Sequence, residues 1–458
     1  MSPLSLETIT KYCDGRLITG DPSTICGSVN TDSRKIQPGE LFFALVGEHF
    51  DAHSFVPQVA LAGAAAVVVS KVPENAASLP CAVIEAEDTL LALQTLARRH
   101  RQLTQPLVVG ITGSNGKTST KDFLAAIMRH KFRVGATLGN LNNHIGVPIT
   151  MLRMKEGDNC GIFEMGMNHA GEIEVLASIA QPDAAIITNI GVAHIEYLGS
   201  RENIAQEKGM LVESITSDGL VVLNANDEFS GALASRNKGR TLLAGIARGD
   251  VTASISESGA SGSTFTLDFP GATQVEVRLP VPGEHMVGNA TLAAACAWHY
   301  GVPPEAIADI LSKVEITKGR LQVKHWHGVT FLDDTYNANP DSMRAGLKTL
   351  AGMNVSGRRI AVLGRMGELG AHAESGHREV GEYAASMGLD AVFTVGDEAS
   401  MIGEAASLAN PKAESKHFRD HADCSDYLRG WLKQNDAVLL KGSRSASMEK
   451  ILTPFEKE

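Results

Sequence analysis

The stretch VVGITGSNGKTSTKDFL at residues 108–124 constrains the fold more than any other part of the chain. It has the pattern of a buried strand, a glycine-rich loop and a helix, which is the context of a phosphate-binding loop. The usual form, G-x-x-x-x-G-K-[ST], requires a glycine at position 111, where this chain has Ile111. Gly113 and Gly116 would still let backbone amides approach an anion at the positive end of the helix dipole.

The alternative for this loop is a simple glycine turn between a strand and a helix. A bare G-x-x-G would favour that turn, but the full TGSNGKT sequence favours a nucleotide site. Lys117 can reach β- and γ-phosphates, and the Thr118 hydroxyl can bind Mg²⁺. We therefore expect the nucleotide to be bound by Gly113, Ser114, Asn115, Gly116, Lys117, Thr118 and Ser119.

Strands alternate with helices on both sides of the loop, which predicts right-handed crossovers and a mainly parallel sheet. Residues 250–279 instead alternate polar and apolar side chains between glycine-rich turns, so they predict antiparallel hairpins. A chain of 458 residues is too long for one core. We expect an α/β protein of three domains: a small N-terminal one at 1–86, a central one with the antiparallel insert at 87–318, and a Rossmann-like one at 319–458.

Composition excludes some classes of protein. The net charge of −11 argues against nucleic-acid binding, because a polyanion is held by a basic surface. The six cysteines are scattered without a C-x-x-C pair, which fits a reducing compartment. The first residues lack the basic start and apolar run of a signal peptide. The longest apolar run, residues 59–69, is shorter than the ~20 residues needed to span a bilayer. We expect a cytoplasmic protein.

Polar side chains follow several predicted strands, where ligands gather in α/β sheets. Glu164 and His194 each follow a buried strand and could hold Mg²⁺ directly or through water. Alone, each is better explained as a helix cap or a satisfied loop residue; together they favour a functional site. Lys208 has the local sequence of an exposed helix lysine. His372 and His377 are likewise expected on a helix surface.

The third domain carries a dense polar cluster, FLDDTYNANPDSM at residues 331–343. A plain turn would not need so many hydrogen-bonding groups. Another strand end supplies a plausible anion site at Lys441, Ser443 and Arg444, and Arg320 could act across a cleft between domains. In the first domain, Ser33 and Arg34 fit either a phosphate-binding pair or a capped turn with an exposed arginine.

Seven motifs, in this order, resemble the Mur ligases: TGSNGKT, EMGMNHAGEIE, TNIGVAHIEYLGS, EKGML, GEHMVGNATLAAA, KGR and DDTYNANPDSM. These are the ATP-dependent amide-forming enzymes of peptidoglycan precursor synthesis. The family uses this loop without the first glycine, which accounts for Ile111. The resemblance covers essentially the whole chain.

Three stretches, TDSRKIQPGELFFAL, GNLNNHIGVPIT and DDTYNANPDSM, resemble the branch that adds D-alanyl-D-alanine to UDP-N-acetylmuramoyl-tripeptide. The resemblance implies an enzyme that joins these substrates through an acyl phosphate and a tetrahedral intermediate, and we expect it to be a monomer. Alternatives are a MurE-type or folylpolyglutamate-synthase-type ligase, or a nucleotide-binding protein without catalysis. The missing DNPR-type motif argues against MurE. The third residue of the tripeptide, diaminopimelate or lysine, stays open.

The resemblance also assigns roles. Lys117 would bind the β- and γ-phosphates, Thr118 and Glu164 would share one Mg²⁺, and His194 would hold a second. Lys208 matches a lysine that CO₂ converts to a carbamate beside the metal, in place of the exposed lysine expected from local sequence. Further contacts are implied to ATP from Asn289, Arg320 and Asp334, to the UDP group from Ser33 and Arg34, to bound substrate from Asn143, and to the dipeptide from Tyr336, Asn337 and Asn339.

Three positions depart from the family pattern. Met286 stands where Asn is common, Ala52 where Gly is usual, and Arg365 where Asp is usual. Arg365 matters most, because it reverses a charge close to the expected cleft. None of the three removes a phosphate or metal group.

Overall fold

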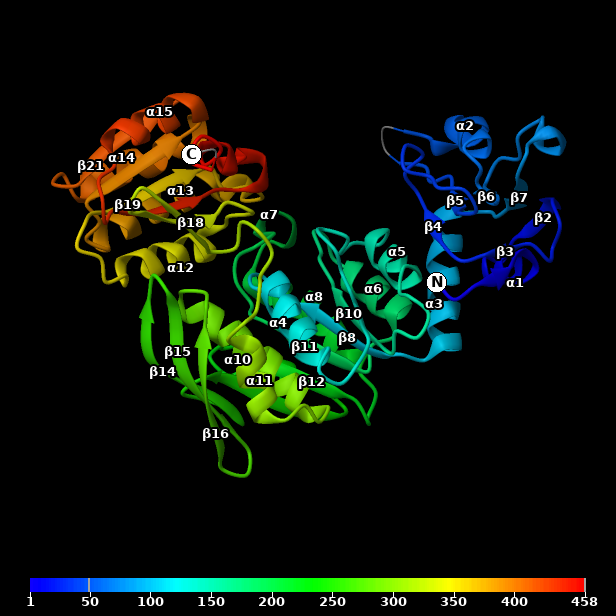
Figure 1. The fold of residues 1–458 in the computed structure, drawn as a ribbon, viewed down its shortest axis with the longest axis horizontal. Helices are drawn as coiled ribbons and strands as arrows, with labels where there is room; N and C mark the ends of the chain where they lie inside the picture. Colours follow the sequence, from blue (N-terminus) through cyan, green and yellow to red (C-terminus); the bar gives the residue numbers. More distant parts are fainter. Residues whose placement is uncertain (48–49, 457–458) are drawn as a thin grey trace.

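The computed structural model describes residues 1–47 and 50–456 and contains three main sheets, one in each predicted interval. In Figure 1 the N-terminal unit, in blue, and the C-terminal unit, in yellow, orange and red, lie on either side of the central unit. This arrangement confirms the predicted α/β fold with three units. We keep 1–86, 87–318 and 319–458 as the proposed domain boundaries.

The N-terminal unit is a five-stranded sheet, in which only the edge strand β2 runs antiparallel to its neighbour. The sheet order is β2 (Arg16–Thr19), β7 (Ala82–Glu85), β6 (Ala66–Val69), β5 (Leu41–Phe43) and β4 (Val29–Asn30). A two-stranded ribbon and two helices complete the unit: β1 (Leu4–Ser5), β3 (Ile25–Cys26), α1 (Leu6–Tyr12) and α2 (Val56–Leu61).

Helix α3 (Thr89–Thr104) joins this unit to the central one. Asp88 caps its first turn by accepting hydrogen bonds from the backbone of Leu90 and Leu91. Gln105 ends it in the left-handed conformation, directly before Pro106. Both ends of the helix therefore carry strong local signals in the sequence.

The central sheet has nine strands: β16 (Thr273–Leu279), β15 (Gly262–Phe269), β14 (Val251–Gly259), β13 (Arg240–Ile246), β12 (Leu220–Asn224), β11 (Ala184–Ile187), β8 (Leu107–Thr112), β10 (Cys160–Glu164) and β9 (Val134–Ala136). The predicted hairpins are present in β14–β16, although β14 pairs in parallel with β13, so the insert extends the same sheet. The helices are α4 (Lys117–Met128), α5 (Gly146–Leu152), α6 (Glu172–Ala180), α7 (Ile195–Leu198), α8 (Arg201–Glu213), α9 (Ser230–Ala234), α10 (Glu284–His299) and α11 (Pro304–Leu311).

The two faces of the central sheet pack against different neighbours, because successive strand residues point to opposite sides. In β8, Val109 and Ile111 join the core that contains α4, α10 and apolar residues of the C-terminal unit. Val108 on the other face joins the core that contains α5, α6, α8 and the N-terminal unit. The sheet therefore shares an apolar core with the C-terminal unit on one face and with the N-terminal unit on the other.

The C-terminal sheet is parallel except for its first strand: β17 (Gln322–Trp326), β18 (Val329–Asp334), β22 (Ala437–Lys441), β19 (Arg359–Gly364), β20 (Ala391–Val395) and β21 (Glu414–Phe418). Its helices are α12 (Pro340–Ala351), α13 (Ala373–Ser386), α14 (Ser400–Ala409) and α15 (His421–Trp431). Strand β21 was not predicted, since it is an edge strand with exposed polar side chains.

One surface prediction is wrong. His377 on α13 is fully buried, and its Nε2 accepts a hydrogen bond from the Met366 backbone at 3.0 Å. His377 has polar neighbours in the sequence, so the local pattern indicated an exposed position. In the structure the histidine holds the loop at Met366.

In the described part of the chain, no helix combines the length and apolar character needed to cross a bilayer.

Candidate active site

The glycine loop connects β8 to α4 and is shaped by two close contacts. Gly113 has φ +151°, and a Cβ there would lie 1.8 Å from the Thr188 hydroxyl. Gly116 has φ +80°, and a Cβ there would lie 2.4 Å from the Asn289 amide oxygen. Ile111, at the position of the missing glycine, is buried within β8. The loop thus needs glycine at 113 and 116, and none at 111.

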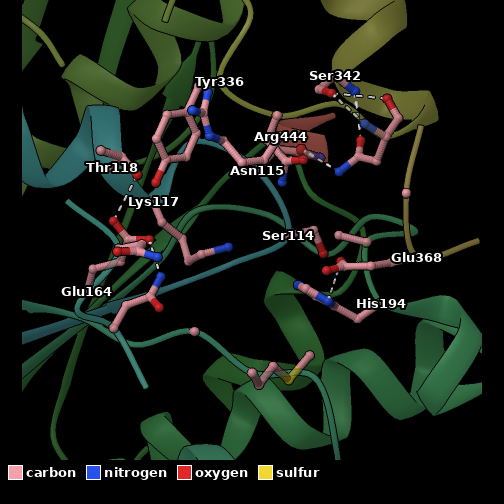
Figure 2. A pocket seen from close by; sticks show the side chains of 18 of the residues that line it. Ser114, Asn115, Lys117, Thr118, Glu164, His194, Tyr336, Ser342, Glu368 and Arg444 are labelled. Atoms are coloured by element: carbon pink, nitrogen blue, oxygen red, sulfur yellow. Dashed lines mark hydrogen bonds and ion pairs between the residues drawn. The ribbon is translucent and has the colours of Figure 1, made fainter. Parts of the chain in front are cut away.

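A cavity of about 850 Å³ lies at this loop between the central and C-terminal units. Figure 2 shows side chains from both units around it. The predicted residues that line it are Ser114, Asn115, Gly116, Lys117, Thr118, Asn143, Glu164, His194, Arg320, Tyr336, Asn337, Asn339 and Arg444. Residues at the ends of strands that lie far apart in the sequence therefore meet in this cavity.

Glu164 and the loop threonine are in direct contact. The Thr118 hydroxyl donates to Glu164 Oε2 at 2.8 Å, and the Asn142 amide donates to Oε1 at 2.8 Å (Figure 2). Behind them, the Glu164 backbone N–H donates to the Thr137 hydroxyl at 3.0 Å. The carboxylate is only 4% exposed, so these bonds fix its position. Asn142 was not predicted as a site residue, since several asparagines follow each other there.

Lys117 lies between Glu164 and His194 in Figure 2. Its ammonium donates to the carbonyl of Gly113 at 2.7 Å. Burial lowers the pKa of this lysine, and the nearby Glu164 carboxylate opposes the shift. The group is a partly buried cation at the start of a helix, which is suited to an anionic ligand.

His194 precedes α7 in a left-handed backbone conformation, with φ +65°. Its Nδ1 lies 2.8 Å from a carboxylate oxygen of Glu368, which follows β19 in the C-terminal unit. Pairing with the imidazole lowers the pKa of the Glu368 carboxyl, against the effect of its burial. Glu368 was not predicted, because the partner lies in another unit.

Lys208 lies within α8 and is 1% exposed, so the surface lysine expected from local sequence is wrong. It does not line the cavity. Burial holds its pKa well below the ordinary value, and the charge of Lys117 lowers it further. Its neighbour Glu207 accepts hydrogen bonds from the backbone of Gly171 and Ile173, both at 2.9 Å, which fixes the start of α6.

Arg320 reaches the loop from the segment between the two units. It donates to the Thr118 hydroxyl at 3.3 Å, and its guanidinium lies 4.2 Å from the centre of the Tyr336 ring. Its Nε is buried and lacks a hydrogen-bond partner among the described residues. An unsatisfied cationic donor beside the glycine loop fits an anionic ligand.

Several predicted residues make structural contacts instead of lining the cavity. Asp334 accepts a hydrogen bond from the buried Lys441, and Asn289 packs against Gly116. Gly113 and Ser119 also lie outside the lining. Ser33 and Arg34 lie in the N-terminal unit beyond the cavity, where Arg34 pairs with Asp32 at 2.8 Å.

Two predicted asparagines line the cavity and also hold the backbone. Asn143 accepts hydrogen bonds from Ile145 and Gly146. Asn339 caps α12, and its amide donates to Asn115 of the glycine loop at 2.8 Å. Its neighbour Asp341, which was not predicted, accepts from the Val192 backbone at 2.9 Å. The C-terminal unit is therefore hydrogen-bonded directly to two loops of the central site.

Arg365 does not line the cavity. Its guanidinium pairs with Glu398 of the same unit at 2.7 Å. The reversed charge at this position is thus neutralised within the C-terminal unit.

The side-chain ligands at the glycine loop fit Mg²⁺ only if phosphates supply further oxygens. Within the described residues, no group of three or more His, Cys, Asp and Glu side chains is placed to hold a metal ion alone. Thr118 and Glu164 do present two adjacent oxygens. Mg²⁺ commonly takes one or two such ligands and completes its shell with phosphates and water. The oxygens present therefore fit a metal that arrives with a nucleotide.

Comparisons with known proteins identify the family of this chain. Three family models match: Mur ligase family, catalytic domain, at residues 27–101; Mur ligase middle domain at 111–297; and Mur ligase, glutamate ligase domain, at 319–444. The UDP-N-acetylmuramoyl-tripeptide–D-alanyl-D-alanine ligase of Bacillus subtilis is 38% identical, over 94% of this chain and 93% of its own.

Two crystal structures are also similar. MurF from Acinetobacter baumannii has a TM-score of 0.90 at 33% identity and covers 100% of this chain and 99% of its own. MurF ligase from Thermotoga maritima in complex with ADP has a TM-score of 0.83 at 27% identity, covering 94% and 97%. The chain belongs to the Mur ligase family, and within it to the MurF group.

Proposed function

We propose that the chain joins D-alanyl-D-alanine to UDP-N-acetylmuramoyl-tripeptide and cleaves ATP to ADP and phosphate. The observation that carries the proposal is the meeting of the glycine loop, the Thr118–Glu164 pair and the C-terminal polar cluster in one cavity. A nucleotide and two further substrates can meet there. The names of the relatives support the choice of substrates.

The reaction needs an activated carboxylate, because an amine cannot displace an oxide from carbon. The terminal carboxylate oxygen of the tripeptide attacks the γ-phosphorus of ATP, and the bond from that phosphorus to ADP breaks. The dipeptide amine then attacks the carbonyl carbon of the acyl phosphate. A tetrahedral intermediate forms and its nitrogen loses one proton. Collapse of the intermediate then breaks the bond from carbon to the phosphate oxygen, and phosphate leaves.

The first step brings an anionic carboxylate against an anionic triphosphate. At an effective dielectric near 20, two unit charges 4 Å apart repel by about 4 kcal/mol. Lys117 and the amides of residues 113–118 place fixed positive charge and donors there. The free Nε of Arg320 adds a donor from the segment between the units. Docking of the C-terminal unit covers the site and excludes water from the acyl phosphate.

Thr118 and Glu164 are proposed to hold one Mg²⁺ and His194 a second. When bound, these ions would neutralise charge that develops on the phosphates. The side chains position the oxygens and the imidazole around the nucleotide. Asn142 and Thr137 keep the Glu164 carboxylate from turning away.

Lys208 is proposed to carry a carbamate. Its burial favours the neutral amine, and only that form attacks CO₂. A bond forms between Nζ and the carbon of CO₂, one proton leaves the nitrogen, and the product is an anion. That anion would be balanced by the neighbouring Lys117 and by metal, in place of two buried cations that repel each other.

The remaining roles follow the family assignment. Ser33 and Arg34 are proposed to contact the UDP group, and Asn143 the bound substrate. Tyr336, Asn337 and Asn339 are proposed to line the dipeptide pocket. Asn289 and Asp334 are proposed to act on the nucleotide through the loop and strand they support. We also propose that the protein acts as a cytoplasmic monomer.

The test is phosphate release from ATP by the purified protein. Release should require both UDP-N-acetylmuramoyl-tripeptide and D-Ala-D-Ala, and should stop when either is left out. Tripeptides with diaminopimelate or lysine at the third position would show which is preferred. Equal release with a single amino acid in place of the dipeptide would reject the proposal in favour of a MurE-type ligase.

A further inference from the structure

Two strained residues face each other where the central and C-terminal units meet. His194 has φ +65° and Glu368 has φ +61°, a conformation that residues other than glycine seldom adopt. Such residues persist only where their surroundings hold them, and they gather at functional sites. Here the strain lies on both partners of one contact, the 2.8 Å approach of the Glu368 carboxylate to His194 Nδ1.

The loop that carries Glu368 is fixed from behind. The buried His377 accepts from the Met366 backbone, and the Arg365 carbonyl accepts from the Ser443 backbone at 2.8 Å. The hydrogen bond from the Ser443 backbone joins this loop to the end of β22, within the C-terminal unit. Leu369 is buried next to Glu368. The carboxylate is therefore presented by a rigid support.

The same loop packs closely on the segment that carries His194. A Cβ added to Gly370 would lie 2.7 Å from the side chain of Glu196 on α7. The imidazole of His194 is mostly buried, while the Glu368 side chain is about half exposed to the cavity. A displaced C-terminal unit would lose this packing and the carboxylate together.

We infer that Glu368 is a positioning residue, which holds the His194 imidazole by Nδ1 and leaves Nε2 to face the nucleotide. Histidines that bind metals commonly have their other ring nitrogen paired with a carboxylate or carbonyl, which fixes the orientation of the ring. Here that carboxylate comes from a different unit of the chain. Docking of the C-terminal unit would therefore complete the site of the second ion. The inference rests on the role proposed for His194.

The experiment compares Glu368→Ala, Glu368→Gln and the control Glu398→Gln. Glu398 lies in the same unit and has an ion pair of similar length with Arg365, away from the cavity. Mn²⁺ binding to the ADP complex is measured by electron paramagnetic resonance, and kcat and KM for D-Ala-D-Ala are measured by phosphate release. Thermal unfolding shows whether each variant is folded.

Glu368→Ala should weaken binding of the weaker Mn²⁺ ion and lower kcat, each by ~10–100-fold. The KM for the dipeptide should change by less than about twofold, because Glu368 acts through His194. Glu368→Gln should recover part of both losses, since its amide oxygen still places a partial negative charge beside Nδ1. In a His194→Ala background, Glu368→Ala should have almost no further effect. The control should match the unmodified protein.

Three results would overturn the inference: unchanged Mn²⁺ binding in Glu368→Ala, a rise in KM for the dipeptide with normal kcat, or additive losses in the double variant. The KM result would mean that Glu368 binds the incoming amine. Failure of the proposed function would look different. The unmodified protein would then release no phosphate with both substrates, whereas the Mn²⁺ measurement needs neither substrate.

Discussion

Lys117→Ala should lower kcat/KM for ATP by about 10³-fold, the largest loss expected from a single substitution in the loop. The ammonium lines the cavity at the start of α4, and the substitution removes the fixed charge that would face the triphosphate. Phosphate release at varied ATP, with both other substrates saturating, measures the effect. Folding should be retained, since the lysine donates its hydrogen bond to a carbonyl of its own loop.

The matched control is Lys131→Ala, which removes a lysine just beyond the end of the same helix. Its ammonium donates a hydrogen bond to the Tyr300 carbonyl, away from the cavity. This variant should keep normal turnover. Turnover in Lys117→Ala within about threefold of the unmodified protein would show that the loop does not bind the reacting phosphates.

Lys208→Ala should lower kcat by ~100-fold, with partial rescue by formate or acetate. The substitution removes the proposed carbamate and leaves space beside Lys117, into which a small carboxylate can bring the missing negative charge. Neither acid should increase the turnover of the unmodified protein. The measurement is phosphate release at rising concentrations of the acid.

The control for rescue is Lys117→Ala, in which a cation is lost and added carboxylate should restore nothing. Lys208→Ala that is folded and fully active would contradict the carbamate. A loss that no small acid restores would also count against it. Detection of an unmodified lysine by mass spectrometry would decide little, because carbamates dissociate easily.

The sequence predicted which side chains meet at the glycine loop, because local patterns encode the strand ends that carry them. Thr118 follows the glycine loop and Glu164 ends the neighbouring strand, so parallel pairing of β8 with β10 brings them to 2.8 Å. Asn339 and Arg320 also reach the loop, as expected of residues on either side of a cleft.

Local sequence patterns could not predict the contacts between units. Glu368 and Asp341 act on His194 and Val192, which lie more than a hundred positions earlier in the chain. Burial of Lys208 and His377 likewise depends on which elements pack over their helices. Their flanking residues are polar, so local sequence indicated exposed positions. For Lys208, only the family resemblance pointed to the active site.

The most direct test of the acyl-phosphate reaction follows oxygen from the tripeptide to phosphate. UDP-N-acetylmuramoyl-tripeptide labelled with ¹⁸O in its terminal carboxylate is incubated with ATP, D-Ala-D-Ala and the protein, and the phosphate is analysed by mass spectrometry. Each phosphate released should carry one ¹⁸O atom, because the bond that breaks last joins the carbonyl carbon to that oxygen. Unlabelled phosphate formed together with the amide product would contradict the mechanism.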